Sequence, residues 1–156
     1  MPMPAQRPGT SRQDYETPDE VLRAVKRRLS IGDFKVDLAA TEQNAICGLW
    51  FDDSFKESWH TFGGWCWCNP PFGTITPWVQ KAWEESLLGA KVAVLIPASV
   101  GSNWWRDWVH EKAHVLFMNG RVKFVGATDM YPKDTALLLY QKSTRGGYEI
   151  WDWRAE

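Results

Sequence analysis

The chain has little net charge, few cysteines and no long apolar run. Its 18 Lys and Arg residues against 19 Asp and Glu give a formal charge of −1, so any contact with nucleic acid has to come from local basic patches. Three cysteines cannot all pair with one another, and neither a signal peptide nor a long apolar stretch is present. We therefore expect a soluble protein of a reducing compartment without membrane contact.

What the chain does have is enough apolar sequence for a proper core. It holds 156 residues, 44% of them apolar, and 11 are tryptophans, which suits one domain and gives no reason for two. Residues 1–14 are rich in Pro, Arg, Ser and Gln, so we expect a flexible N-terminal arm there. Residues 15–156 are then expected to form a single domain.

Apolar patterns typical of strands and helices alternate along this domain. Strands are expected at 34–40, 64–68, 91–97, 114–118, 121–125, 135–141 and 147–153. Helices are expected at 18–29, 78–88 and 103–112, whereas 41–63 looks irregular. The last two strands are expected to pair around Arg145-Gly146-Gly147. This order predicts an α/β fold with flanking helices and a mixed sheet that has an antiparallel edge.

The first helix has a strong start pattern. Thr17 is expected as the N-cap, Pro18 at the first helical position, and Glu20 in a position to complete a capping box with Thr17.

The run Asn69-Pro70-Pro71-Phe72 can grip an exocyclic amine. Such an amine is a poor nucleophile, because its lone pair is delocalised into the base. Two acceptors for its N–H protons, the Asn69 side-chain carbonyl and the Pro70 carbonyl, would draw the nitrogen toward a tetrahedral shape. The prolines keep the loop rigid, and Phe72 can stack on the base. An ordinary Pro-Pro turn fits the same residues, so context has to decide.

Three expected strands end in residues that suit a ligand site. Ligands of open α/β sheets bind beyond the carboxyl ends of the strands. The Asp37, Asn69 and Pro97 ends would therefore converge on one crevice, which puts the amine grip beside a cofactor pocket.

Around this grip, short motifs follow one another in a fixed order. They are Tyr15-x-Thr17-Pro18, Val36-Asp37-Leu38-Ala39-Ala40, Asn44-Ala45, Asp52-Asp53-Ser54-Phe55, Cys68-Asn69-Pro70-Pro71-Phe72, Pro77-Trp78-Val79-x-Lys81-Ala82-x-x-Glu85, Leu95-Ile96-Pro97-Ala98 and Gly120-Arg121-Val122-x-Phe124. This ordered set resembles the phage-type DNA N6-adenine methyltransferases, the Dam-like family.

The resemblance implies a Rossmann-like fold that binds S-adenosylmethionine (SAM) across the ends of the first strands. Asp37 would lie near the methionine ammonium or the ribose, where a carboxylate suits the positive charge of the donor. Either Asp52 or Asp53 would hold the SAM adenine, and we favour Asp53. The cofactor-binding residues implied in this way are Thr17, Pro18, Asp37, Ala39 and Asp53.

The implied reaction is methyl transfer from SAM to the N6 amine of adenine in double-stranded DNA. The adenine would flip out of the duplex and stack on Phe72, with its N6 hydrogens on Asn69 and Pro70. Positioning would supply most of the acceleration, and no metal is required. The residues expected to contact DNA are Arg121, Lys123, Phe124 and Trp104.

The resemblance also implies a biological setting. We expect no separate target-recognition domain beyond the loops. Sequence specificity is then expected to be loose, or to come from residues 41–63, 99–106 and 125–134. Phage DNA modification in the bacterial cytoplasm, as protection against host restriction, is the expected role. The oligomeric state stays open, and a homodimer is one way to hold DNA.

Other readings of the sequence remain. N4-cytosine methylation needs the same amine grip, and a non-catalytic DNA-binding protein could keep the fold. The sequence His110-Glu111-Lys112-Ala113-His114 matches the H-E-x-x-H pattern of zinc hydrolases, but a strand follows at once, so His114 is expected beyond the end of the helix. The pair Cys66-x-Cys68 lacks the usual spacing of a zinc finger.

Overall fold

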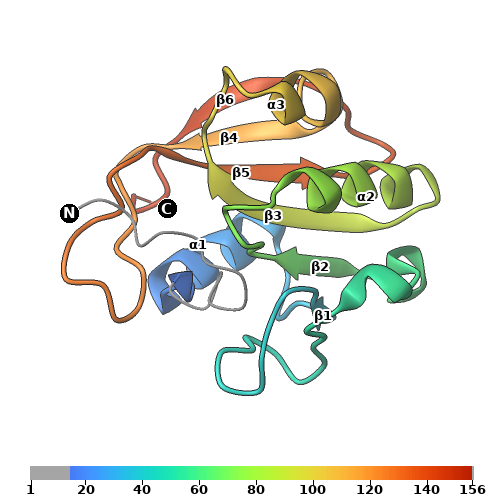
Figure 1. Ribbon diagram of the computed structural model, residues 1–156, viewed down its shortest axis with the longest axis horizontal. Helices are drawn as coiled ribbons and strands as arrows, with labels where there is room; N and C mark the ends of the chain where they lie inside the picture. The colour runs from blue at the N-terminus through green and yellow to red at the C-terminus, as the bar shows by residue number, and fades with distance from the viewer. Residues whose placement is uncertain (1–14, 156) are drawn as a thin grey trace.

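In residues 15–155, which the computed structural model describes, six strands form one sheet and three α-helices cover its faces (Figure 1). The elements are α1 (Asp19–Leu29), β1 (Val36–Asp37), β2 (Trp65–Cys68), α2 (Thr76–Leu87), β3 (Lys91–Pro97), α3 (Asn103–Trp108), β4 (His114–Met118), β5 (Thr135–Tyr140) and β6 (Tyr148–Trp151). The arm expected at 1–14 lies outside the described residues.

The strand order is β1-β2-β3-β5-β4-β6, and only one of these strands runs against the others. The first three strands are parallel, β5 is antiparallel to both β3 and β4, and β6 is parallel to β4. The mixed α/β sheet is confirmed, but its antiparallel strand is internal and not at the edge. Every residue of β5 is buried, which suits an internal strand, whereas β6 exposes Tyr148 and Ile150.

The expected pairing of the last two strands with each other is wrong, because β4 lies between them. The Arg145-Gly146-Gly147 turn allowed a hairpin, since both glycines have positive φ. However, β5 forms antiparallel ladders with β3 and β4, and these buried pairings decide its position.

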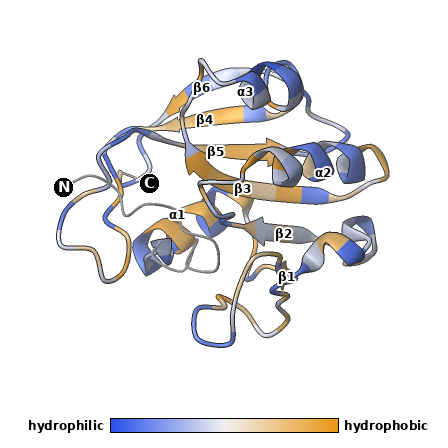
Figure 2. Cartoon of the chain, in the orientation of Figure 1, coloured by the Kyte–Doolittle hydropathy of each residue, from blue (hydrophilic) through white to orange (hydrophobic). Residues whose placement is uncertain are grey.

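The core consists of two apolar clusters, one on each face of the sheet. Trp65 and Trp67 of β2 pack with α1, while Cys66 and Cys68 pack with α2, because successive strand residues point to opposite faces. Helices α2 and α3 therefore cover one face and α1 the other (Figure 1). Strands β4 and β5 are mostly hydrophobic in Figure 2, and the outer side of α3 is hydrophilic.

The start of α1 differs from the expected cap. Its N-cap is Pro18 and no side chain caps it, so the prediction of Thr17 as N-cap and Pro18 as the first helical residue is wrong. The Thr17 hydroxyl instead accepts a hydrogen bond from Asn69. Glu20 makes no capping box, and its carboxylate accepts a hydrogen bond from Arg154 at 3.2 Å.

The strand expected at 121–125 is also wrong. Val122 and Phe124 are buried and their neighbours are exposed, which explains the alternating pattern. The segment has no partner strand, and its only ladder contact among the described residues is an isolated bridge between Val125 and Glu16. The alternating pattern of residues 121–125 therefore indicates which side chains are buried, and it does not indicate a strand of the sheet.

Other elements are confirmed with shifted ends. Strand β1 is shorter than 34–40, because the chain bends after Asp37. Helix α3 ends at Trp108 and not at 112, and Glu111 beyond it has a φ of 62°. Helix α2 starts at Thr76 and so includes Pro77 in its first turn. Region 41–63 is irregular as expected, apart from two short 3-10 helices.

None of the helices described in residues 15–155 is long and apolar enough to cross a bilayer.

Candidate active site

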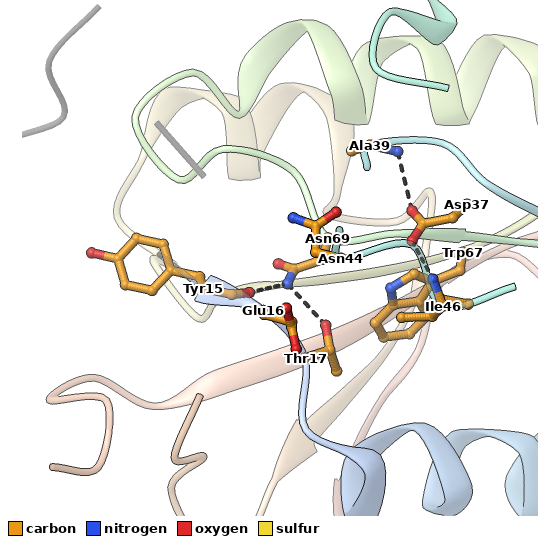
Figure 3. Close-up of a pocket in the computed structure, with 9 residues that line it drawn as sticks. All are labelled: Tyr15, Glu16, Thr17, Asp37, Ala39, Asn44, Ile46, Trp67 and Asn69. Atoms are coloured by element: carbon orange, nitrogen blue, oxygen red, sulfur yellow. Dashed lines mark hydrogen bonds between the residues drawn. The ribbon is translucent and has the colours of Figure 1, made fainter. Parts of the chain in front are cut away.

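The polar residues at the ends of β1 and β2 meet at one narrow hollow (Figure 3). Asp37 ends β1, and Asn69 directly follows β2. The hollow has a volume of about 20 Å³, which is room for about one water molecule. Its lining is Tyr15, Glu16, Thr17, Asp37, Ala39, Asn44, Ile46, Trp67 and Asn69. The expected meeting of Asp37 and Asn69 is confirmed, whereas Pro97 does not line this hollow.

Asp37 organises the loop on one side of the hollow. It is 3% exposed, and its two carboxylate oxygens accept hydrogen bonds from the backbone N–H groups of Ala39 and Ile46, each at 3.2 Å. Burial raises the pKa of Asp37 from 3.8 to about 6, although these two hydrogen bonds oppose the rise. The carboxylate is therefore costly when ionised, and a cation at the hollow would stabilise it.

Asn69 is held from the other side by the 15–17 segment. Its side-chain nitrogen Nδ2 donates to the Tyr15 carbonyl at 2.5 Å and to the Thr17 hydroxyl at 2.9 Å (Figure 3). A backbone carbonyl can only accept, so the nitrogen end of the amide has to face Tyr15. The carbonyl oxygen Oδ1 is buried and accepts no hydrogen bond from any described residue. Asn69 thus keeps one acceptor for a ligand.

The two prolines after Asn69 differ in what their carbonyls do. The Pro71 carbonyl accepts a hydrogen bond from Thr74 N–H at 3.2 Å, which closes a turn. No residue in the described part of the chain donates to the Pro70 carbonyl. The Pro70 carbonyl oxygen is thus a second acceptor, on the residue that follows Asn69 in the chain.

Phe72 belongs to an aromatic cluster beside this grip. Its ring stacks on Tyr15, with ring centroids 5.0 Å apart and planes 14° apart. Phe124 meets the Phe72 ring edge-on at 5.9 Å, and Tyr131 lies at 5.5 Å. A base that stacks on Phe72 would therefore have aromatic neighbours on several sides, and Tyr15 covers one ring face.

The four residues expected to contact DNA lie in different settings. Arg121 and Lys123 are exposed, and Arg121 bonds weakly with Asp134 at 3.4 Å. Phe124 is 2% exposed and belongs to the Phe72 cluster, which suits a wall of a base pocket better than a phosphate contact. Trp104 lies in α3, within the helix expected at 103–112, and is half-buried against the core.

A larger hollow of about 430 Å³ adjoins the narrow one. The two hollows share four lining residues, namely Glu16, Thr17, Asn44 and Ile46. The volume falls within the range of about 300–1,000 Å³ of ordinary ligand sites. Of the residues expected to bind a cofactor, Thr17 lines both hollows and Asp37 and Ala39 line the narrow one.

The other two expected cofactor residues lie elsewhere. Asp53 is exposed and its carboxylate accepts a hydrogen bond from Phe55 N–H at 3.3 Å, so it caps the 3-10 helix Ser54–Lys56. Pro18 lines neither hollow, and its carbonyl accepts the first backbone hydrogen bonds of α1.

The H-E-x-x-H sequence does not form the helical face that zinc hydrolases need. His110 and Glu111 lie in the turn after α3, and His114 begins β4. His114 bonds with Glu149 at 2.6 Å and His110 with Tyr148 at 2.7 Å. No group of three or more His, Cys, Asp or Glu side chains in residues 15–155 is placed to hold a metal ion.

Comparison with protein-family models matches residues 5–143 to the family described as DNA N-6-adenine-methyltransferase (Dam). The match covers far more than half of the chain. The chain belongs to this family. The resemblance that the ordered motifs indicated is thereby confirmed.

Two phage proteins of the same description are similar to this member of the family. The DNA N-6-adenine-methyltransferase of Escherichia phage T1 is 25% identical over 113 residues, which are 71% of this chain and 47% of the relative. That of Haemophilus phage HP1 (strain HP1c1) is 28% identical over 118 residues, which are 69% of this chain and 67% of the relative. The chain therefore spans about half the length of the first relative and two thirds of the second.

The sequence did not identify every residue at this site. Tyr15 contributes both its carbonyl and its ring, and Ile46 contributes its N–H to Asp37. The motif Tyr15-x-Thr17-Pro18 contained a signal for Tyr15, because a helix start does not need an aromatic residue two positions before the expected cap Thr17. Tyr131 lies in a stretch without such a motif, and only the fold places it beside Phe72.

Proposed function

We propose that this protein transfers a methyl group from SAM to the N6 amine of adenine in double-stranded DNA. Membership of the Dam family supports the class of reaction. The observation that carries the proposal within the structure is the fixed Asn69 amide. Both its N–H groups are engaged by the 15–17 segment, while its carbonyl oxygen is left for a ligand.

The chemistry follows from the two free acceptors. Asn69 Oδ1 and the Pro70 carbonyl accept the two N6 hydrogens of a flipped adenine, which localises the amine lone pair out of the ring plane. Phe72, with Phe124 and Tyr131 around it, holds the base by stacking. Because both acceptors are fixed before the base arrives, they lower the barrier by positioning. The proton leaves the product amine to water.

The residues of the narrow hollow fit the cofactor. When bound, SAM supplies an electrophilic methyl group on a sulfonium. The Asp37 carboxylate would face its positively charged methionine end. The rise in the pKa of Asp37 to about 6 supports this placement, because a nearby cation would favour the ionised form of the buried carboxylate. Ala39 leaves room at the same wall, and Thr17 lies where both hollows meet. A Rossmann-like fold suits the site at the strand ends.

Asp53 stays a proposed cofactor residue, as does Pro18 next to Thr17, although neither lines the two hollows. Asp53 has one carboxylate oxygen on Phe55 N–H and is otherwise exposed, so its second oxygen is free to take an adenine amino group.

The proposed partner is duplex DNA, held along its phosphates by exposed basic residues such as Arg121 and Lys123. Trp104 is half-buried and packs against Trp105 at 5.8 Å, so only the exposed part of its ring would contact DNA. The described residues bring Asp37 and Asn69 together at one edge of a single sheet, so we propose that residues 15–156 form one catalytic domain and that its loops take part in reading the target. Protection of phage DNA in the bacterial cytoplasm is the proposed role.

The test is mass spectrometry of nucleosides from polymerase-amplified, unmethylated duplex DNA after incubation with the protein and SAM. We expect N6-methyladenine from the natural protein and from Asn119→Ala, an exposed control, but none from Asn69→Ala. N4-methylcytosine instead would keep the amine grip and overturn the choice of base. Methylation that survives in Asn69→Ala would overturn the proposed site.

A further inference from the structure

The 15–17 segment lines the narrow hollow with all three of its residues. The Tyr15 ring stacks on Phe72, and the Glu16 carbonyl accepts a hydrogen bond from Val125 N–H at 3.0 Å. The Thr17 hydroxyl accepts from Asn69 Nδ2. Thr17 is 6% exposed, so this bond is shielded from competing water. The segment is thus tied to the site at both ends.

We propose that Thr17 is a positioning residue, whose hydroxyl, with the Tyr15 carbonyl, locks the Asn69 amide so that Oδ1 faces the target amine. The proposal rests on the proposed function. An amide that turns over by half a rotation exchanges its acceptor for two donors, and donors would repel the N6 hydrogens. Because the Tyr15 carbonyl and the Thr17 hydroxyl both accept from Asn69 Nδ2, the amide is held in the orientation that catalysis needs before any base binds.

The lock also explains why an amide, and not a carboxylate, suits position 69. The Tyr15 carbonyl lies 2.5 Å from the side-chain nitrogen. A carboxylate oxygen in the same place would face that carbonyl with no proton between two acceptors. The 15–17 segment therefore selects Asn over Asp at this position. We expect Asn69→Asp to methylate DNA at least tenfold more slowly than the natural protein.

Thr17 also lines both hollows, so a direct cofactor contact has to be separated from positioning. Thr17→Val keeps the shape and removes the acceptor, while Thr17→Ser keeps the hydroxyl. Thr61→Val is the matched control, because the exposed Thr61 hydroxyl bonds only locally, with the Ser58 carbonyl at 2.7 Å. Three quantities are measured for each variant: the single-turnover methylation rate, the Kd of S-adenosylhomocysteine, and the ¹⁵N–¹H signals of the Asn69 side-chain amide.

For Thr17→Val we expect a methylation rate lower by about three- to tenfold, the size of one neutral hydrogen bond. The Kd should stay within about twofold, and the Asn69 amide signals, identified by their loss in Asn69→Ala, should shift. Thr17→Ser should restore rate and signals, and Thr61→Val should change neither.

Two results would overturn the proposal. One is a Kd that rises as much as the rate falls with unmoved Asn69 signals, which would make Thr17 a cofactor contact. The other is an unchanged rate with unmoved signals, which would leave Thr17 without a role in catalysis. If the natural protein methylates no nucleoside, the proposed function fails, and the amide signals still decide whether Thr17 holds Asn69.

Discussion

Because Asp37 is buried, SAM binding should become weaker as the pH falls from 7 to 5. In the free protein its pKa is about 6 against 3.8 for an exposed Asp. A rise of that size corresponds to about 3 kcal/mol of unfavourable burial for the ionised form. Because the pKa of Asp37 is higher in the folded protein than in the unfolded chain, the folded state holds this proton more tightly. The contribution of Asp37 to the free energy of unfolding should therefore fall as the pH rises from about 4 to about 6.

A cation beside Asp37 reverses this cost, because it favours the ionised carboxylate. At pH 7 about nine tenths of Asp37 is ionised in the free protein, and at pH 5 about one tenth. If binding needs the carboxylate, the apparent Kd of SAM should be about tenfold higher at pH 5 than at pH 7. Isothermal titration calorimetry at pH 5, 6 and 7 measures this directly, and proton release on binding at pH 5 is a second sign.

Asp37→Asn isolates the cause. The amide can accept only one of the two bonds now received from Ala39 and Ile46, but it removes the buried charge, so we expect the free energy of unfolding at pH 7 to change by less than about 2 kcal/mol. SAM binding should weaken at pH 7 and lose its dependence on pH. The control variant Asp129→Asn, on an exposed loop, should bind SAM with the same dependence on pH as the natural protein. A Kd of the natural protein that is flat between pH 5 and pH 7 would refute the role of Asp37.

Three further predictions concern single residues. Ser54 is fully buried and its hydroxyl has no partner among the described residues, so Ser54→Ala should raise the free energy of unfolding by about 1 kcal/mol in urea denaturation; a loss would contradict this. Gly120 has a φ of +97°, and an added Cβ would lie 2.6 Å from Arg154, so Gly120→Ala should cost more than about 1 kcal/mol in the same assay. Phe72→Leu should raise the KM for DNA by about tenfold through lost stacking and leave the Kd of S-adenosylhomocysteine unchanged; an unchanged KM would remove Phe72 from the base pocket.

The parts of the fold that the sequence predicts well are those decided by local patterns. Strand β3 has the bounds expected from its continuous apolar run, and its central place in the sheet follows because both of its faces are covered. Asp37 and Asn69 meet because parallel strands bring their carboxyl ends to one edge. Applying that rule requires only that β1 and β2 are parallel, and the alternation of helices and strands in the sequence predicts this.

The parts that the sequence misses are decided by contacts between distant residues. Segment 121–125 has the alternation of a strand, yet Val122 and Phe124 are buried without a partner strand. Phe124 packs on Tyr15 and Phe72 instead. A pattern of period two shows only that alternate side chains of a segment are buried. Whether the segment is a strand depends on pairing with residues far away in the sequence, which the local pattern does not contain.

Thr17 shows why a strong local pattern can still be overruled. As an N-cap its hydroxyl would contribute about 1 kcal/mol to α1. Without Thr17, one N–H of the Asn69 amide would be left unpaired close to the core, at a cost of about 1–3 kcal/mol. The tertiary contact is at least as strong, and Pro18 can take the N-cap position because its carbonyl already accepts from Val21 and Leu22. The sequence Thr17-Pro18 therefore serves the candidate site first, and the helix begins one residue later.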